Sequence, residues 1–124
     1  LKLLGQRLEQ TAQRASAHSA YQEHAQHLRQ AWQEIVQTTL QAGQYEPQRA
    51  LANAVPYMQA FGHVVLAWIW LDVALSCTGS SSHEVGQRAA CQFFYRYELP
   101  KIGAWLRVVQ TADNTCLDMP ADAF

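Results

Sequence analysis

Hydrophobic residues recur at steps of three and four along most of the chain, which is the spacing of one face of an α-helix. In the N-terminal third this stripe stands among Gln, Arg and His residues, so the opposite helix face is expected to be solvated. A weak point at 16–20 divides the stripe, and one long helix weakened there or two collinear helices are predicted, over residues 2–18 and 20–42. Gly43 is a credible end for the second helix, because glycine readily takes the left-handed conformation there.

The next predicted helix covers residues 47–76 and carries two prolines. Pro47 suits the first helical position, where the missing N–H costs no hydrogen bond, and Pro56 is expected to kink the helix. Most of the helix is the nearly continuous apolar stretch 60–75. This stretch is shorter than the about 20 residues that cross a bilayer, and it contains ionisable residues that are expensive in lipid. It is therefore predicted to be the central helix of a bundle, surrounded by other helices.

The last predicted helix covers residues 82–111. Ser81 followed three residues later by Glu84 is the capping-box pattern that starts a helix, and Pro100 is expected to produce a second kink. Residues 112–124 mix Asp, Asn, Thr and Pro and are predicted to be irregular. No segment alternates with period two over the length of a strand. The predicted fold class is all-α, an antiparallel bundle of three to four long helices.

Composition agrees with a single helical domain over residues 1–124. Hydrophobic residues make up 49 %, which excludes intrinsic disorder. Charged residues make up 15 %, and the net charge is −1. No basic excess exists to hold a nucleic-acid backbone or an anionic membrane, so neither partner is expected. The chain opens on Leu1 without a secretory signal pattern, which suggests a processed protein or a fragment of something larger, and a cytoplasmic location is expected.

Cysteine and histidine spacings give no metal site. The three cysteines are Cys77, Cys91 and Cys116, an odd number without ligand spacing, and reduced thiols are expected. A disulfide between Cys77 and Cys91 is geometrically possible across a helical hairpin, but nothing in the sequence requires it. His24 and His27 share a helix face, and the prediction is two solvated side chains rather than metal ligands. No catalytic motif with a nucleophile, a phosphate loop or paired metal ligands occurs.

The two C-terminal helices should form a hairpin, which places residues at equal distances from its turn at the same height. Asp72 then faces the level of Arg88, and an ion pair between them is predicted because a carboxylate in an apolar helix needs a partner. His63 faces the level of Tyr97. His63 is expected to be a core histidine bonded to a carbonyl or to the Tyr97 hydroxyl. No nucleophile or carboxylate is predicted beside it, so it is given no catalytic role.

Aromatic side chains are concentrated in the same two helices. Trp68 and Trp70 cannot point the same way, because they lie about 200° apart on a helix. Some aromatic surface should therefore face away from the hairpin, to be covered by the N-terminal helices or by another protein surface. Seven residues are structural or interface candidates. They are His63, Asp72, Arg88, Tyr97, Trp68, Trp70 and Trp105.

Two segments resemble the C-terminal helical domain of long acyl-CoA dehydrogenases of the methylmercaptopropionyl-CoA dehydrogenase type. The segment 53–75 reads NAVPYMQAFGHVVLAWIWLDVAL, with a Phe-Gly pair followed by a tryptophan-rich apolar stretch, and resembles one family helix. The segment 88–109 reads RAACQFFYRYELPKIGAWLRVV and resembles the following helix. The tail with Met119 and Phe124 is similar to the natural end of such enzymes.

The resemblance implies a parent oxidoreductase of fatty acid metabolism. That flavoprotein would oxidise an acyl-CoA to the 2,3-enoyl-CoA, with a glutamate base and FAD as hydride acceptor. Because base and FAD would lie in earlier domains, no catalytic, cofactor-binding or metal residue is assigned here, and Glu84 and Glu98 are not proposed as the base. The chain alone is expected to be inactive, with a structural or assembly role.

The partners implied are the remaining domains of the parent and a second copy in a homo-oligomer. The alternative from a different class is an independent helical interaction or dimerisation module without catalytic activity. A third reading, a metal-binding helical bundle, would require metal in the purified protein.

Overall fold

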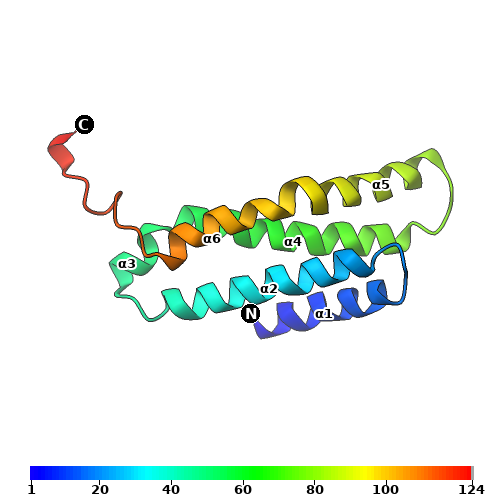
Figure 1. Cartoon of the computed structure of the whole chain (residues 1–124), viewed down its shortest axis with the longest axis horizontal. Coiled ribbons are helices and arrows are strands. Elements are labelled where there is room, and N and C mark those ends of the chain that lie inside the picture. The colour runs from blue at the N-terminus through cyan, green and yellow to red at the C-terminus, as the bar shows by residue number, and fades with distance from the viewer. Residues whose placement is uncertain (124) are drawn as a thin grey trace.

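The computed structural model describes residues 1–123, which form helices joined by short loops (Figure 1). No strand occurs in this range, so the predicted all-α class is confirmed. The helices are α1 (Lys2–Ser16), α2 (Gln22–Ala42), α3 (Pro47–Ala52), α4 (Ala54–Ser76), α5 (Ser82–Phe93) and α6 (Ile102–Gln110).

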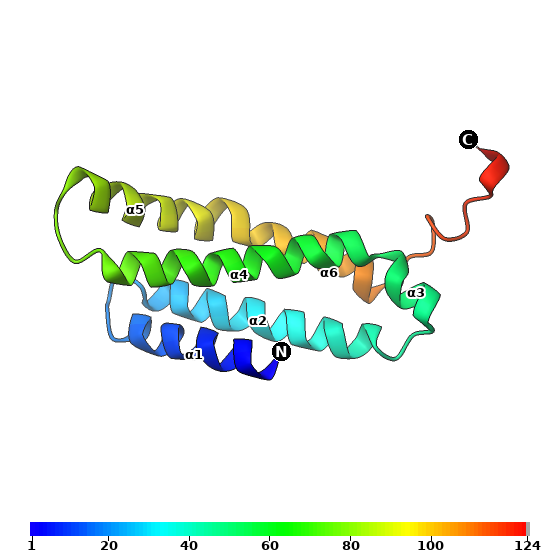
Figure 2. The same ribbon diagram turned by 180° about the vertical axis from the view of Figure 1, so that it is seen from behind.

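The long helices lie side by side as an antiparallel bundle (Figures 1 and 2). α1 packs antiparallel on α2 (Figure 1), so the expectation of one long helix or two collinear helices over residues 2–42 was wrong. α4 packs on α2 and on the rod formed by α5 and α6. α1 is shorter than its neighbours, so it follows only part of α2, and the N-terminus lies near the middle of the bundle (Figure 2). The bundle end that carries α3 is therefore left with fewer covering helices.

The interruption expected near Pro56 lies at Asn53, where α3 ends and α4 begins. The Asn53 side-chain amide donates to the Asp113 carbonyl over 2.8 Å and ties this break to the C-terminal segment. Pro56 is consequently the third residue of α4, in the first turn, where backbone N–H groups have no intrahelical acceptor. The missing N–H of this proline therefore costs the helix no hydrogen bond.

The interruption expected near Pro100 is a change of helical pitch. A π-helical turn, Phe94–Glu98, is followed by a 3₁₀ turn, Leu99–Lys101, and the chain then resumes as α6. Pro100 has no N–H and its ring would clash with the carbonyl four residues earlier, so a regular α-helix cannot pass this point. The wider π-helical turn and the tighter 3₁₀ turn accommodate Pro100, so the helical rod of α5 and α6 continues through this point.

The helix ends follow local signals in part. The capping box is confirmed, since the Ser81 hydroxyl accepts from the Glu84 N–H over 3.3 Å, and α5 begins at Ser82. α2 ends before Gly43, but this glycine has a φ of −65°, so the left-handed conformation expected there was wrong. The left-handed position is Ala112, with a φ of 49°, just after α6.

The core is built from small and branched aliphatic side chains on facing helices. Seven of its buried residues are alanines, which let the helix backbones approach closely, and the largest fully buried aliphatic side chains are Leu28, Ile35, Leu71 and Leu106. A Cβ on Gly5 would lie 2.9 Å from the Trp32 ring, so glycine is what lets α1 rest on that tryptophan. The predicted irregular tail ends in a short 3₁₀ turn, Ala121–Ala123, and Phe124 lies outside the described residues.

Candidate functional site

Asp72 does not pair with Arg88, so that prediction was wrong. Its carboxylate forms an ion pair with Arg14 of α1 and accepts from the Thr11 hydroxyl over 3.3 Å. The Trp68 indole N–H in turn donates to the Thr11 hydroxyl over 2.9 Å. The hairpin geometry did not give the rotation of α4, because the Asp72 side chain faces α1 rather than α5.

Arg88 is committed to the loop between α4 and α5. One guanidinium nitrogen donates to the carbonyl oxygens of Cys77 and Gly79 over 2.7 and 2.8 Å. These carbonyls follow the end of α4, where backbone oxygens have no helical donor. Arg88, which lies on α5, therefore holds the α4–α5 loop against that helix. The three cysteines are free thiols, and burial raises the pKa of Cys91 to about 12.

His63 has a carboxylate beside it, which the sequence analysis did not expect. Its Nδ1 lies 3.2 Å from the Gln59 carbonyl oxygen, and its Nε2 lies 3.3 Å from Glu98 Oε2. Glu98 also accepts from the Lys101 ammonium over 2.9 Å. The hydrogen bonds from Lys101 and then His63 hold the pKa of Glu98 below its usual value of 4.5.

Tyr97 is not the partner of His63. Its ring stacks on Phe93 at a centroid distance of 4.7 Å, and its side chain is mostly exposed. Trp105 lies beside the histidine instead, with the two rings in an edge-to-face arrangement at a centroid distance of 4.7 Å. The π-helical turn explains the difference, because the extra residue in that turn rotates Tyr97 outward and Glu98 toward α4.

The His63–Glu98 pair is a structural link rather than a catalytic dyad. A dyad that activates a nucleophile needs a hydroxyl or thiol within hydrogen-bond reach of the histidine. Within residues 1–123 the ring nitrogens of His63 meet only the Gln59 carbonyl and Glu98. Over the same range no three His, Cys, Asp or Glu side chains gather as metal ligands.

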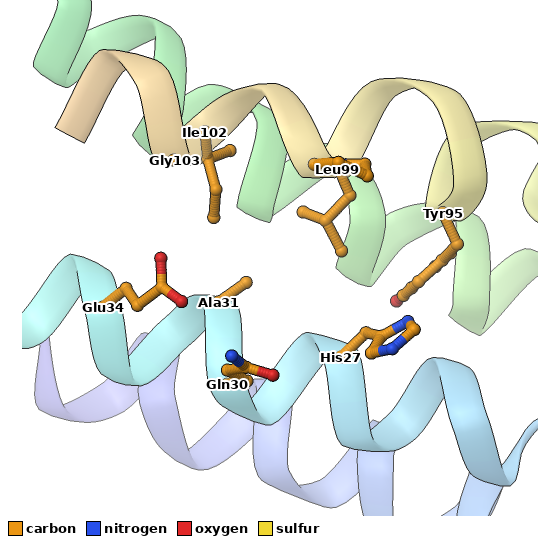
Figure 3. Close-up of a pocket in the computed structure, with 9 residues that line it drawn as sticks. His27, Gln30, Ala31, Glu34, Tyr95, Leu99, Ile102 and Gly103 are labelled. Atoms are coloured by element: carbon orange, nitrogen blue, oxygen red, sulfur yellow. The ribbon is translucent and has the colours of Figure 1, made fainter. Parts of the chain in front are cut away.

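His24 is buried, so the prediction of two solvated histidines on α2 was wrong for this residue. Its ring stacks on Tyr95 at a centroid distance of 4.5 Å, and burial lowers its pKa. His27 remains exposed and lines a small cleft together with Glu34 of α2 and with Leu99 and Ile102 opposite (Figure 3). This cleft holds about 200 Å³, less than the roughly 300 Å³ at which ligand pockets begin.

The tryptophans do not supply the uncovered surface. Trp68, Trp70 and Trp105 are each partly buried against the core. Among residues 1–123 the exposed aromatic rings are instead Phe93 and Tyr97. A sequence can state that two tryptophans two residues apart diverge, but not which of the two directions neighbouring helices cover.

The larger uncovered surface is aliphatic and belongs to α4. We call Val55, Met58, Leu66 and Ile69 the outer face of α4; their exposed fractions are 70, 60, 45 and 46 %. The helix is thus not surrounded on all sides, which corrects the expectation from its composition. Gly62 lies between these residues in sequence, and a Cβ there would meet no other atom within 4 Å. Apolar patches of this kind on a surface mark contacts with other molecules.

Apolar surface continues from this face toward α3. A cleft of about 350 Å³ is lined by Leu51, Tyr57, Met58 and Val109, among other side chains that are almost all apolar. Met58 belongs to both surfaces. By length and composition alone α4 is also the one helix of the described residues that is apolar enough to cross a membrane. Its inner face forms the bundle core, with Val64, Ala67 and Leu71 fully buried.

Comparison with known proteins gives one match. A family model described as "Acetyl-CoA dehydrogenase C-terminal like" matches residues 4–120, which include nearly all of α1 and every later α-helix. Neither the curated proteins nor the solved structures contain a match.

Proposed function

The chain belongs to the acetyl-CoA dehydrogenase C-terminal-like family, and from that membership we propose that it is the C-terminal domain of an FAD-dependent acyl-CoA dehydrogenase. The parent would oxidise an acyl-CoA to the 2,3-enoyl-CoA in the cytoplasm, with FAD as the hydride acceptor. The methylmercaptopropionyl-CoA type is the subtype we propose, because segments 53–75 and 88–109 resemble it. The family match supports the coarser statement, a domain of acyl-CoA dehydrogenase-like enzymes.

The residues of this chain do not fit FAD. Dinucleotide sites place a glycine-rich turn between a strand and a helix, where backbone N–H groups meet the pyrophosphate. The chain has no such glycine pattern, and residues 1–123 contain no strand. FAD is therefore assigned to other domains of the parent, and the isolated chain is proposed to be catalytically inactive.

The role we propose for the domain is structural, and the outer face of α4 carries that proposal. Leu66 and Ile69 are about half exposed in the middle of the longest helix. Removing apolar surface from water is favourable by about 25 cal/mol per Å². The remaining domains of the parent are the proposed partner, because a domain of a larger chain meets its own neighbours at high effective concentration.

The full-length product of the gene tests the proposal. We expect its purified form to carry FAD and to reduce it on addition of an acyl-CoA, and we expect deletion of residues 1–124 to lower its thermal stability or dissociate its subunits. Absence of flavin would overturn the enzyme assignment. Unchanged stability, assembly and activity after the deletion would overturn the structural role.

A paired set of variants sharpens the test. Leu66→Gln with Ile69→Gln changes the outer face of α4 and should weaken the attachment of the domain to the parent. Leu3→Gln with Leu40→Gln is the matched control, because these leucines are 79 and 67 % exposed on α1 and α2. Equal effects of the two pairs would show that the outer face has no special role.

The second candidate is an independent module that self-associates, and the same outer face favours it. Two copies could bury this face against each other. The same contact would join two copies of the parent in the homo-oligomer that we propose. Sedimentation of the isolated chain separates the cases. A monomer at micromolar concentration agrees with docking on other domains, and a dimer abolished by Leu66→Gln with Ile69→Gln favours self-association.

A further inference from the structure

A cleft lined by both polar and apolar side chains lies between the N-terminal end of α2 and the outward side of α5. Its volume is about 380 Å³, which is within the range of small-molecule sites. α2 and the loop before it contribute one wall, and α5 with the π-helical turn contributes the other; the two helices run toward the same end of the bundle (Figure 1). The lining residues are Ala20, Tyr21, Glu23, His24, Val85, Arg88, Ala89, Gln92 and Arg96.

The α2 wall carries the uncapped start of a long helix. α2 has 21 residues, and no side chain caps its N-terminus at Tyr21. The first backbone N–H of this helix with a carbonyl acceptor is that of Ala25, which donates to Tyr21 over 2.9 Å. The N–H groups of Gln22, Glu23 and His24 come before it in the first turn. Free N–H groups and the positive end of the helix dipole together attract an anion.

His24 gives an independent observation at this cleft. The residue is 8 % exposed, and its Nδ1 has no hydrogen-bond partner among the residues that the structure describes. Buried polar atoms in folded proteins are nearly always hydrogen-bonded. The unpaired nitrogen of this cleft-lining residue is therefore a second observation, beside the helix N-terminus, that favours a polar ligand here.

The α5 wall supplies the positive charge. Arg96 makes no hydrogen bond or ion pair to any other side chain of residues 1–123. Arg88 uses one nitrogen for the loop carbonyls, which leaves its other N–H groups available. Two guanidinium groups match the oxygens of a phosphate, which accepts paired hydrogen bonds from arginine. The low net charge of the chain does not oppose this, because the charges are local.

Three further side chains restrict the ligand. The Glu23 carboxylate also lines the cleft and repels an anion, so binding depends on the two guanidinium groups outweighing this single carboxylate. Val85 and Ala89 add an apolar surface beside the arginines. That surface leaves room for an organic group attached to the anion.

We propose that this cleft binds a small organic phosphate monoester, with its phosphate between Arg96, Arg88 and the first turn of α2 and its apolar part against Val85. This goes beyond the proposed function, which assigns no ligand to the domain. It also gives His24 a polar neighbour that the unliganded chain lacks.

Titration of the 124-residue chain, which has its own buried core, tests the proposal by nuclear magnetic resonance. Phenyl phosphate should shift the backbone N–H signals of Gln22, Glu23 and His24 and the imidazole nitrogens of His24, all with one saturable midpoint. Inorganic phosphate should shift the same signals with lower affinity, and phenol should not. Shifts that stay linear and spread over all basic residues would overturn the site. Equal affinities for the two phosphates would overturn the monoester.

Matched arginine variants complete the test. Arg96→Gln should weaken phenyl phosphate binding about tenfold, because a hydrogen bond between charged groups is lost. Arg107→Gln removes the same charge from an exposed position on α6 and should leave the affinity unchanged. Equal weakening by both variants would show a general charge effect and overturn the proposed site.

Discussion

The two faces of α4 are both apolar in sequence, yet the chain covers only one of them. On the inner face Val64, Ala67 and Leu71 are fully buried. On the outer face Leu66 and Ile69 keep nearly half of their surface in contact with water. The difference teaches that the apolarity of a helix does not by itself predict burial on every side, because this chain covers only one of the two apolar faces.

Leu71→Ala tests the inner face and should have the largest effect. The side chain is fully buried in the core, and shortening such a leucine removes burial and leaves a cavity. We expect the free energy of unfolding to fall by about 3 kcal/mol, measured by urea denaturation. A loss below about 1 kcal/mol would show that the inner face is not packed as described.

Thr11→Val tests the side of α4 that faces α1. The substitution keeps the shape but removes the hydroxyl that accepts from Trp68 and donates to Asp72. An unpaired part-buried donor should lower the free energy of unfolding by about 1 to 2 kcal/mol. Thr111→Val is the control, because that exposed hydroxyl, just after α6, bonds only to carbonyls of α6. Equal losses in both variants would remove the case for this network.

Glu98→Gln tests the side of α4 that faces α6, through the pH dependence of stability. The Glu98 pKa is lowered in the folded state by Lys101 and then His63. The stabilisation is therefore present above the usual pKa of 4.5 and is lost as the pH falls through the lower folded value. Glu98→Gln should be less stable than the wild type at pH 7 and similar to it at low pH.

Glu34→Gln is the matched control for that profile, since Glu34 forms none of the ion pairs found in residues 1–123. If the difference in the free energy of unfolding between the wild type and Glu98→Gln does not change with pH, the proposed role of the carboxylate is contradicted. The effect should be smaller than that of Thr11→Val, because both partners of Glu98 are partly exposed.

Leu66→Gln with Ile69→Gln tests the outer face and should have the smallest effect on the isolated chain. Both side chains already contact water, so each change should alter the free energy of unfolding by less than about 0.5 kcal/mol. Calorimetry of the isolated chain gives the measurement. A loss like that of Leu71→Ala would mean that the outer face is covered by this chain, and the comparison of the two faces would fail.

Sequence reasoning was most successful where the signal is local. The capping box at Ser81 depends on neighbours three residues apart, and the bundle class follows from the spacing of apolar residues. The break before α4 was expected near Pro56 but lies at Asn53, because proline is tolerated in a first turn. A resemblance carried by two segments also anticipated the family that the match over residues 4–120 shows.

The side-chain partners could not be predicted, because they depend on how each helix is rotated. Asp72 and Arg88 were expected to meet but face different neighbours, Arg14 and the loop carbonyls. Glu98 reaches His63 only because a π-helical turn shifts the register by a residue. The burial of His24 follows from the stacking of α2 on Tyr95, a contact between residues far apart in sequence.

Oxidative labelling of the two methionines tests the central claim most directly. Met58 lies on the outer face of α4 and is 60 % exposed, and Met119 lies in the C-terminal segment and is 44 % exposed. The rate of Met58 oxidation by dilute peroxide, relative to that of Met119, is compared in the isolated chain and in the full-length parent. Docking of α4 predicts a several-fold lower ratio in the parent. An unchanged ratio would contradict the proposal that the parent covers this face.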